Sequence, residues 1–301
     1  MKKLVILLVF LLCLPVAARG GQITDDAGTT IEFSAPFTRI ISLYPAHTEN
    51  LFNLGLDEQI IGVSTSEDFP SEALTKPQFN ARDGVEKFLA AKPDLILIRP
   101  MHLRSHPALW SALKRQGIKV LALQPSTIDQ MYAYWRKLGR LTGKEPEAEK
   151  MIANFKSGLE KAESRLDRVP ANKRPKVFFE SVHRKYATFT PGSMPLFVLK
   201  TAGGRNVATD AKANHDSNIA NYGLERMLNK GSQIDVYLSQ HGHMNEVSER
   251  DIANAPAASR IKAVRDRNVF LVDEHLVSRP TMRLLQGIET VHQLLYPGGI
   301  R

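Results

Sequence analysis

The stretch GVEKFLAAKPDLILI at residues 84–98 has a counterpart in the second half of the chain, GLERMLNKGSQIDVYL at residues 223–238. Both begin with Gly, an aliphatic residue, Glu and a cation, and both reach an Asp and an apolar run after a helix breaker, Pro93 or Gly231. In each stretch the apolar residues first recur about every 3.6 positions and then become continuous, which predicts a short amphipathic helix followed by a buried strand. Because the pattern occurs once in each half, the chain is predicted to contain two similar lobes.

The rest of the sequence extends this arrangement. The chain has 301 residues, 43% of them hydrophobic and 24% charged, which is typical of a globular protein with two domains of ordinary size. Apolar strand patterns alternate with helical patterns in both halves, and this predicts an α/β fold with two parallel sheets. We expect an N-terminal lobe at residues 19–125, linking helices at residues 126–169 and a C-terminal lobe at residues 170–301.

The linking segment carries one apolar stripe. Its members stand three or four positions apart and are Ile152, Phe155, Leu159, Ala162 and Leu166. This spacing predicts a helix over residues 147–168, roughly 30 Å long at 1.5 Å per residue, that bridges both lobes. A coiled-coil partner helix is the alternative, and a stripe of fewer than four heptads does not favour it.

The first twenty residues, MKKLVILLVFLLCLPVAARG, have a separate role. A lysine pair, a short apolar run and a small-residue end predict a signal peptide at residues 1–18, cleaved near Ala18, because the apolar run is too short to span a bilayer. We therefore expect a periplasmic protein. Cys13 follows Leu12 rather than a small residue, so lipid anchoring at Cys13 is not expected.

Composition excludes several classes of function. The formal net charge is +9, but the Lys and Arg residues are scattered, and neither a basic run nor a Cys/His finger spacing is present, so nucleic acid is not an expected partner. Cys13 is the only cysteine. After cleavage near Ala18 the chain would therefore have no disulfide, no thiolate metal site and no Cys nucleophile.

The order of motifs carries a resemblance to a known family. RIISLYPAHTENLFNLGLDEQIIGVS at residues 39–64 is followed by the Glu-headed helix and strand of residues 84–98, a long central helix and a second lobe that repeats the first. This order resembles the class III periplasmic binding proteins, the receptors of ABC importers for cobalamin, haem and ferric siderophores. The resemblance implies two Rossmann-like lobes joined by one backbone helix, a ligand cleft, no catalysis and no intrinsic cofactor. It also implies a monomeric receptor whose partner is the permease dimer of an ABC importer.

Candidate ligand contacts stand at predicted strand exits, where ligands bind in such folds. They are Tyr44, Phe69, Phe79, Met101 and His102 in the first lobe, and His183, His241, His243, His275 and Arg279 in the second. Neutral imidazole is a common metal ligand, and aromatic and Met side chains suit a large chelate. The candidates for direct metal contact are His102, His183, His241 and His243. The alternative for each histidine is a solvated or hydrogen-bonded loop residue.

The identity of the chelate stays open between three classes. Haem receptors of the family commonly use a Tyr near the place of Phe79, and that difference disfavours haem. Cobalamin receptors bring several Trp residues to the cleft, whereas this chain has only Trp110 and Trp135, both in helical patterns. Anionic ferric chelates favour Arg, and Arg104, Arg184 and Arg279 are available for such contacts. We expect a ferric siderophore or a corrinoid, with haem as the alternative.

A hydrolase is the competing hypothesis from another class. VYLSQHGHMNE at residues 236–246 resembles the opening of the metallo-β-lactamase motif, in which two histidines two positions apart bind zinc. Asn245 and Glu246 stand where that motif has its Asp and its last His. Since both differences remove metal ligands, we do not expect an enzyme.

Glu86 and Glu225 are the third residues of the two similar stretches, residues 84–98 and 223–238. In the family, a Glu at this place in each lobe meets Arg residues on the two permease subunits, so the resemblance assigns transporter docking to Glu86 and Glu225. A two-fold symmetric permease offers the same cationic pocket twice, and a receptor must present two similar acidic groups to fit it. The alternative is that each Glu only favours the positive end of its own helix.

Overall fold

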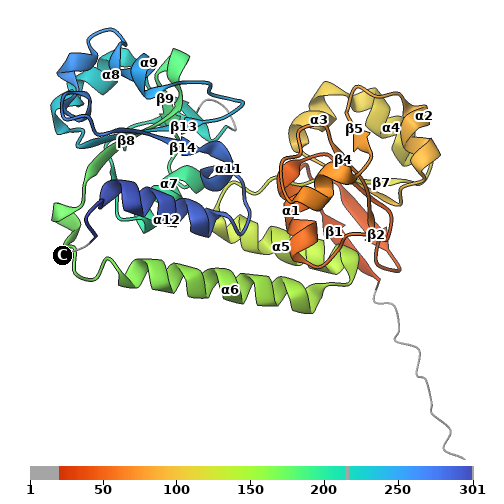
Figure 1. The fold of residues 1–301 in the computed structure, drawn as a ribbon. Helices are drawn as coiled ribbons and strands as arrows, with labels where there is room; N and C mark the ends of the chain where they lie inside the picture. Colours follow the sequence, from red (N-terminus) through yellow and green to blue (C-terminus); the bar gives the residue numbers. More distant parts are fainter. Residues whose placement is uncertain (1–19, 214–216, 300–301) are drawn as a thin grey trace, which may run out of the picture.

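The computed structural model describes residues 20–213 and 217–299, which form two α/β lobes connected along one side by a long helix (Figure 1). The predicted signal peptide at residues 1–18, with Cys13 and Ala18, lies outside the described residues. Within the described part of the chain, no helix combines the length and the apolar character needed to cross a membrane.

The N-terminal lobe contains a five-stranded, fully parallel sheet in the order β5-β4-β3-β6-β7, with an antiparallel hairpin of β1 and β2 beside it. Its strands are β1 Gly21–Thr24, β2 Thr30–Phe33, β3 Ile40–Ser42, β4 Ile60–Ser64, β5 Gln78–Phe79, β6 Leu95–Ile98 and β7 Lys119–Ala122. Its helices are α1 Pro45–Asn53, α2 Val85–Ala91, α3 Pro100–Ser105 and α4 Pro107–Arg115.

Burial on both faces explains the parallel sheet of this lobe. All four residues of the interior strand β6 are buried, as expected when helices cover both faces of a parallel sheet. One face packs against Phe88 and Trp110 from α2 and α4, and the other joins the main core. Trp110 and Trp135 are 1% and 0% exposed, so both tryptophans are core residues.

Two antiparallel helices, α5 Ile128–Thr142 and α6 Glu145–Ser164, link the lobes. Helix α6 has 20 residues and is therefore about 30 Å long. It begins two residues before the predicted start of residues 147–168 and ends four residues before the predicted end. Pro146 in the first turn suits a helix start, and Pro170 disfavours a helical residue 169, so the chain leaves the helix before it.

The backbone helix α6 packs closely on the other linking helix, α5, and on α12 of the C-terminal lobe. Gly139 of α5 faces Ala148, and a Cβ at Gly139 would lie 2.8 Å from the Ala148 Cβ. Gly158 faces Leu285 of α12, and a Cβ there would lie 2.5 Å from the Leu285 Cδ1. Two glycines therefore let α6 approach a neighbour near each of its ends.

The C-terminal lobe contains a mixed sheet in the order β11-β12-β9-β8-β13-β14, with β10 paired to β8. Its strands are β8 Lys176–Val182, β9 Ala187–Phe189, β10 Arg205–Asn206, β11 Lys212–Ala213, β12 Ile219–Asn221, β13 Val236–His241 and β14 Val269–Asp273. Its helices are α7 Met194–Thr201, α8 Leu224–Asn229, α9 Glu249–Ala253, α10 Lys262–Arg265, α11 Glu274–Val277 and α12 Leu284–Leu295. Strands β8, β13, β14 and β10 are parallel as predicted, whereas the pairings of β9, β11 and β12 are antiparallel.

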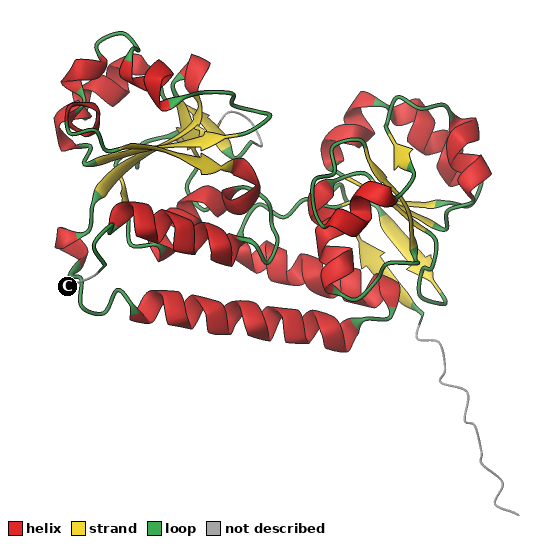
Figure 2. Cartoon of the chain, viewed as in Figure 1, coloured by secondary structure: helices red, strands yellow, loops and turns green. Residues whose placement is uncertain are grey.

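The two similar stretches of sequence, residues 84–98 and 223–238, both form a short helix followed by a strand. Helix α2 leads into β6, and helix α8 leads into β13, and each of these strands has a neighbour on both sides in its own sheet. Figure 2 shows helices around the strands of each lobe. Lys92 ends α2 in the left-handed conformation with a φ of 51° immediately before Pro93. After α8 the chain makes a 3-10 turn at Gly231–Gln233 before it enters β13. The two-lobed α/β fold expected from the sequence is confirmed.

Candidate binding cavity between the lobes

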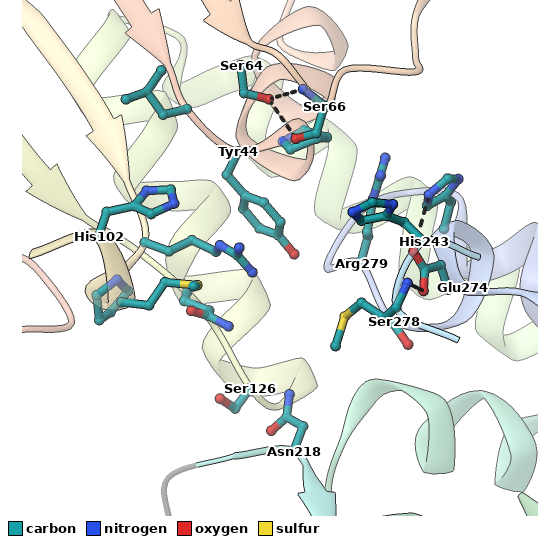
Figure 3. Close-up of a pocket in the computed structure, with 18 of the residues that line it drawn as sticks. Tyr44, Ser64, Ser66, His102, Ser126, Asn218, His243, Glu274, Ser278 and Arg279 are labelled. Atoms are coloured by element: carbon teal, nitrogen blue, oxygen red, sulfur yellow. Dashed lines mark hydrogen bonds and ion pairs between the residues drawn. The ribbon is translucent and has the colours of Figure 1, made fainter. Parts of the chain in front are cut away.

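A cavity of about 1380 Å³ lies between the two lobes. Its N-terminal wall comes from the exits of β3, β4 and β6, and its C-terminal wall from the exits of β13 and β14. Figure 3 shows Tyr44 and His102 on one side of the open space, with His243, Glu274 and Arg279 on the other. Side chains from two sheets thus face one another, as at ligand sites of open α/β folds.

Most of the predicted contacts line this cavity. They are Tyr44, Phe79, Met101, His102, His243, His275 and Arg279. The other three, Phe69, His183 and His241, are not part of its lining. The Phe69 ring lies under the guanidinium of Arg283, 4.5 Å from ring centroid to Cζ. His183 Nδ1 lies 3.0 Å from Glu180 Oε1, and His241 Nδ1 lies 3.0 Å from the carbonyl oxygen of Val247.

The N-terminal wall carries an arginine that the sequence reasoning missed. Arg99 stacks on Tyr44, with 4.6 Å between its Cζ and the ring centroid, and its buried Nε has no hydrogen-bond partner in the described chain. Arg99 directly follows β6, so its place at a strand exit was the available signal. A guanidinium held on an aromatic ring in a cavity is suited to an anionic or acceptor-rich group of a ligand.

His102 adds a neutral imidazole to the same wall. Burial, together with the positive charges of Arg99 and His106, lowers the pKa of His102 to about 4. Its buried Nδ1 has no hydrogen-bond partner among the described residues. At neutral pH the ring is therefore uncharged and has a nitrogen available as an acceptor or a metal ligand.

A second histidine, His47, is buried behind Tyr44 and supports the wall. Its Nε2 lies 3.2 Å from the carbonyl oxygen of Ile98, and its Nδ1 lies 2.6 Å from the hydroxyl of Tyr134. Because a carbonyl can only accept, Nε2 donates to it and Nδ1 accepts from the tyrosine. Burial lowers the pKa of His47 to about 3, so it stays neutral and acts as a structural link between β6 and α5.

Glu67 is a further lining residue that the sequence reasoning missed. Its Oε1 accepts hydrogen bonds from the Thr48 hydroxyl at 3.0 Å and from the Ser64 hydroxyl at 2.8 Å. Burial raises the pKa of Glu67 to about 7, although these hydrogen bonds act to lower it. The cavity therefore contains a carboxyl group that gains and loses its proton near neutral pH.

Charged pairs connect the lobes at the cavity edge. Asp68 lies 2.6 Å from Arg279 Nη1 and 3.1 Å from His275 Nδ1. Burial acts to raise the pKa of Asp68, but the hydrogen bond and charge of Arg279 outweigh it, and the pKa lies below its ordinary value. Arg279 and His275, two predicted ligand contacts, are thus held by a carboxylate of the opposite lobe.

A second interlobe pair is more deeply buried. Arg283 Nη2 lies 2.8 Å from Glu49 Oε2, and Glu49 is 1% exposed. Next to it, the amide of Asn50 donates to the carbonyl oxygen of Pro280 at 3.0 Å. We call these four residues, together with Asp68 and Arg279, the interlobe clasp.

The candidate metal ligands do not converge. Within residues 20–213 and 217–299, no group of three or more His, Cys, Asp or Glu side chains is arranged to hold a metal ion. His102 and His243 line opposite walls of the cavity, while His183 and His241 bond within the C-terminal lobe. Asn245, at the place of the motif's Asp, is 5% exposed, and its side chain forms hydrogen bonds within the C-terminal lobe.

The two predicted docking residues occupy equivalent places. Glu86 and Glu225 are each the second residue of a short helix, α2 or α8, and both are exposed. Figure 1 shows α2 and α8 on the side of the molecule away from α6, one on each lobe.

Comparisons with known proteins agree with this architecture. A family model described as periplasmic binding protein matches residues 40–276. The chain is 24% identical over 282 residues to the uncharacterized ABC transporter substrate-binding lipoprotein YvrC of Bacillus subtilis, with 91% of this chain and 85% of YvrC covered. It is 25% identical over 262 residues to the vitamin B12-binding protein of Vibrio cholerae, with 85% of this chain and 88% of that protein covered.

A solved structure with the same fold is that of a possible iron-binding, periplasmic solute-binding protein from Staphylococcus epidermidis. It superposes with a TM-score of 0.75 at 28% sequence identity, and the match covers 86% of this chain and 99% of that one. The similarity therefore extends over both lobes and the helix between them.

Proposed function

Because the chain belongs to the periplasmic binding protein family, we propose that it binds a metal chelate, a ferric siderophore or a corrinoid, in the interlobe cavity and delivers it to an ABC importer. The observation that carries the choice of ligand is the cavity itself. Its volume of about 1380 Å³ exceeds the range of about 300–1,000 Å³ that is usual for small-molecule pockets. A ligand of chelate size fits this space, and the named relatives include a vitamin B12-binding and a possible iron-binding protein.

The chemistry of the walls supports a polar chelate with an anionic side. Arg99 and Arg104 line the cavity from the N-terminal lobe, while Ser278 and Asn218 offer neutral hydrogen-bonding groups from the C-terminal lobe. A ligand with negative groups on one face and amide or hydroxyl groups on the other would satisfy both walls.

A titration with defined probes tests this proposal. We expect saturable binding of cyanocobalamin or of the ferric hydroxamate ferrichrome, with the visible absorption band of the bound probe recovered unchanged on release. Arg99→Ala should weaken that binding about 10-fold or more, since it removes a charged contact, whereas Arg115→Ala on the outer surface of α4 should not. Failure of every chelate to bind, or turnover of the probe, would overturn the proposal.

Haem is the second candidate, and His102 is the observation that favours it. A neutral imidazole whose buried nitrogen lacks a partner in the described chain could approach the iron of a haem in the cavity. Haem titration of the parent and of His102→Ala separates this candidate: loss of a shifted Soret band in the variant supports haem, and an identical spectrum in both proteins argues against it.

We further propose that Glu86 and Glu225 dock the receptor on the two subunits of an importer permease, and that the receptor is a monomer. Both carboxylates are exposed on helices α2 and α8, one on each lobe. Two similar acidic groups on one monomer match a partner with two-fold symmetry.

Export to the periplasm belongs to the same proposal. We propose that residues 1–18 are removed and that Cys13 carries no lipid, because Leu12 precedes it. YvrC, a similar protein, is named a lipoprotein, so lipid attachment at Cys13 is the competing outcome. The intact mass of the exported protein separates the two: a diacylglyceryl mass on Cys13 would contradict the proposal.

A further inference from the structure

The segment HGHMN at residues 241–245 forms a turn after β13 that contributes His243 and Met244 to the cavity wall. Both side chains are exposed, Met244 to 59%. Exposed side chains on a turn normally move among several conformations. The structure, however, ties the backbone of this turn to the interior of the lobe through the residue that follows Met244.

Asn245 uses both ends of its side-chain amide inside the lobe. Its Nδ2 donates to the carbonyl oxygen of Gln240 at 2.7 Å and to the Ser239 hydroxyl at 3.2 Å. Its Oδ1 accepts from the backbone N–H of His183 at 2.8 Å. Asn245 thereby connects the turn to β13 and to the end of β8.

A buried carboxylate stands behind this connection. The Ser239 hydroxyl has one proton, which it donates to Glu180 Oε2 at 2.8 Å, so it must accept the bond from Asn245. Glu180 is 0% exposed and also accepts from the Tyr237 hydroxyl at 2.7 Å. The hydrogen bonds therefore form a chain in which Asn245 donates to Ser239 and Ser239 donates to Glu180.

A contact on the other side holds the turn as well. The N–H of Met244 donates to Glu274 Oε2 at 3.3 Å. Gly242 permits this approach, because a Cβ at that position would lie 2.4 Å from the Glu274 Cγ.

We propose that Asn245, anchored by Ser239 and Glu180, is a positioning residue that fixes the turn of residues 242–245, so that His243 and Met244 meet the ligand in one conformation. The proposal rests on the proposed function, since it takes this cavity to be the chelate site. It also explains the His-x-His-x-Asn sequence: the side chain at the place of a zinc-ligating Asp is directed into the lobe and orders the wall. The turn then loses its conformational entropy when the protein folds, so that less entropy is lost when the ligand binds.

A label on the turn tests the positioning role without any ligand. In a Cys13→Ser background, Met244→Cys provides one thiol for a fluorescent reagent. We expect the anisotropy of the label to fall when Asn245→Ala or Ser239→Ala is added, because the turn gains local motion. Asn229→Ala, an exposed residue of the same lobe, serves as the matched control and should leave the anisotropy unchanged. Unchanged anisotropy in both variants, with the fold confirmed by circular dichroism, would overturn the proposal.

Affinity provides the second measurement, in proteins that keep Met244. Asn245→Ala should weaken binding of cyanocobalamin or ferrichrome by about 5- to 10-fold, as expected when a pre-ordered contact must be ordered on binding. A lower melting temperature with unchanged affinity would show a purely structural role and contradict the proposal. If the parent binds neither probe, the proposed function fails, while the anisotropy still decides whether Asn245 positions the turn.

Discussion

Glu67 experiences two opposing influences at the cavity wall. Withdrawal from water favours its neutral form, and the hydroxyl groups of Ser64 and Thr48 favour its charged form. Burial has the larger effect, so the pKa of the folded state is raised to about 7. The carboxyl is therefore protonated in part of the molecules at neutral pH, and the polarity of the cavity changes with pH.

The raised pKa of Glu67 predicts that its contribution to stability is lost as pH rises. Between the ordinary value of 4.5 and about 7 the folded protein holds a proton on Glu67 that the unfolded chain releases, so this group's contribution to the free energy of unfolding falls as pH increases through this range, whereas the lowered pKa values of His47 and His102 act in the opposite direction. Glu67→Gln should remove the contribution of Glu67 and leave that of the histidines. Urea unfolding at pH 5 and pH 8 measures it, with the exposed Glu58→Gln as control. An equal pH dependence in parent and Glu67→Gln would contradict the assignment.

Sequence patterns predicted which residues line the cavity better than they predicted the hydrogen-bond and ion-pair partners of those residues. The sequence predicts His102 and His243 as contacts because each follows the end of a predicted strand, and both line the cavity. The end of a buried strand can be predicted because the local sequence changes there from apolar to polar residues. The local sequence could not show that Arg279 pairs with Asp68, which is 211 positions away in the chain. His183 also follows a strand, but it bonds to Glu180, whose burial depends on the packed sheet.

At the scale of elements, the helix-strand units were predictable and the strand pairings were not. The units α2-β6 and α8-β13 each carry a complete local signal: a helical period, a breaker and an apolar run. Strands β9, β11 and β12 have two or three residues each, too few to show an alternating pattern. Their antiparallel pairing depends on contacts that only the folded lobe provides.

The contact between α5 and α6 yields a prediction at this scale. Gly139→Ala should destabilise the protein by about 1–3 kcal/mol, because the added Cβ would lie 2.9 Å from the backbone oxygen of Lys144. Gly158→Ala is the matched control, since only the flexible end of Leu285 stands near its Cβ, and both changes bring the same gain in helix propensity. Chemical unfolding compares the two. A Gly139→Ala variant as stable as Gly158→Ala would show that α5 and α6 can move apart without a loss in the free energy of unfolding.

At the scale of the whole molecule, the interlobe clasp fixes one lobe on the other. Arg283→Ala would leave Glu49, 1% exposed, buried without its cation, and we expect a loss of about 3 kcal/mol in stability. Arg279→Ala should cost less, about 1 kcal/mol or below, because Asp68 is 29% exposed. Denaturant unfolding gives both values, and small-angle scattering should detect wider lobe separation for Arg283→Ala. Equal losses in the two variants would contradict this ranking.

The proposed docking role also belongs to the whole molecule, because Glu86 and Glu225 lie on different lobes. Glu86→Arg with Glu225→Arg should leave folding and chelate affinity intact and should abolish ligand-stimulated ATP hydrolysis by the reconstituted importer, since each introduced positive charge would repel a cationic pocket on the permease. The control makes the same charge change on exposed residues of α6, Glu160→Arg with Glu163→Arg. Stimulation that survives the first double variant, or that is lost equally in the control, would show that Glu86 and Glu225 only favour their helix ends.

The continuous helix α6 has a kinetic consequence. Its 20 residues join the lobes without an extended crossover that could act as a hinge, and the clasp adds contacts at the cavity edge. A chelate could then enter the cavity between the lobes without a prior lobe movement, and no slow conformational step would precede its binding. Encounter rates for different chelates would be similar and set by diffusion and charge, so that discrimination among them would lie in how long each one stays bound.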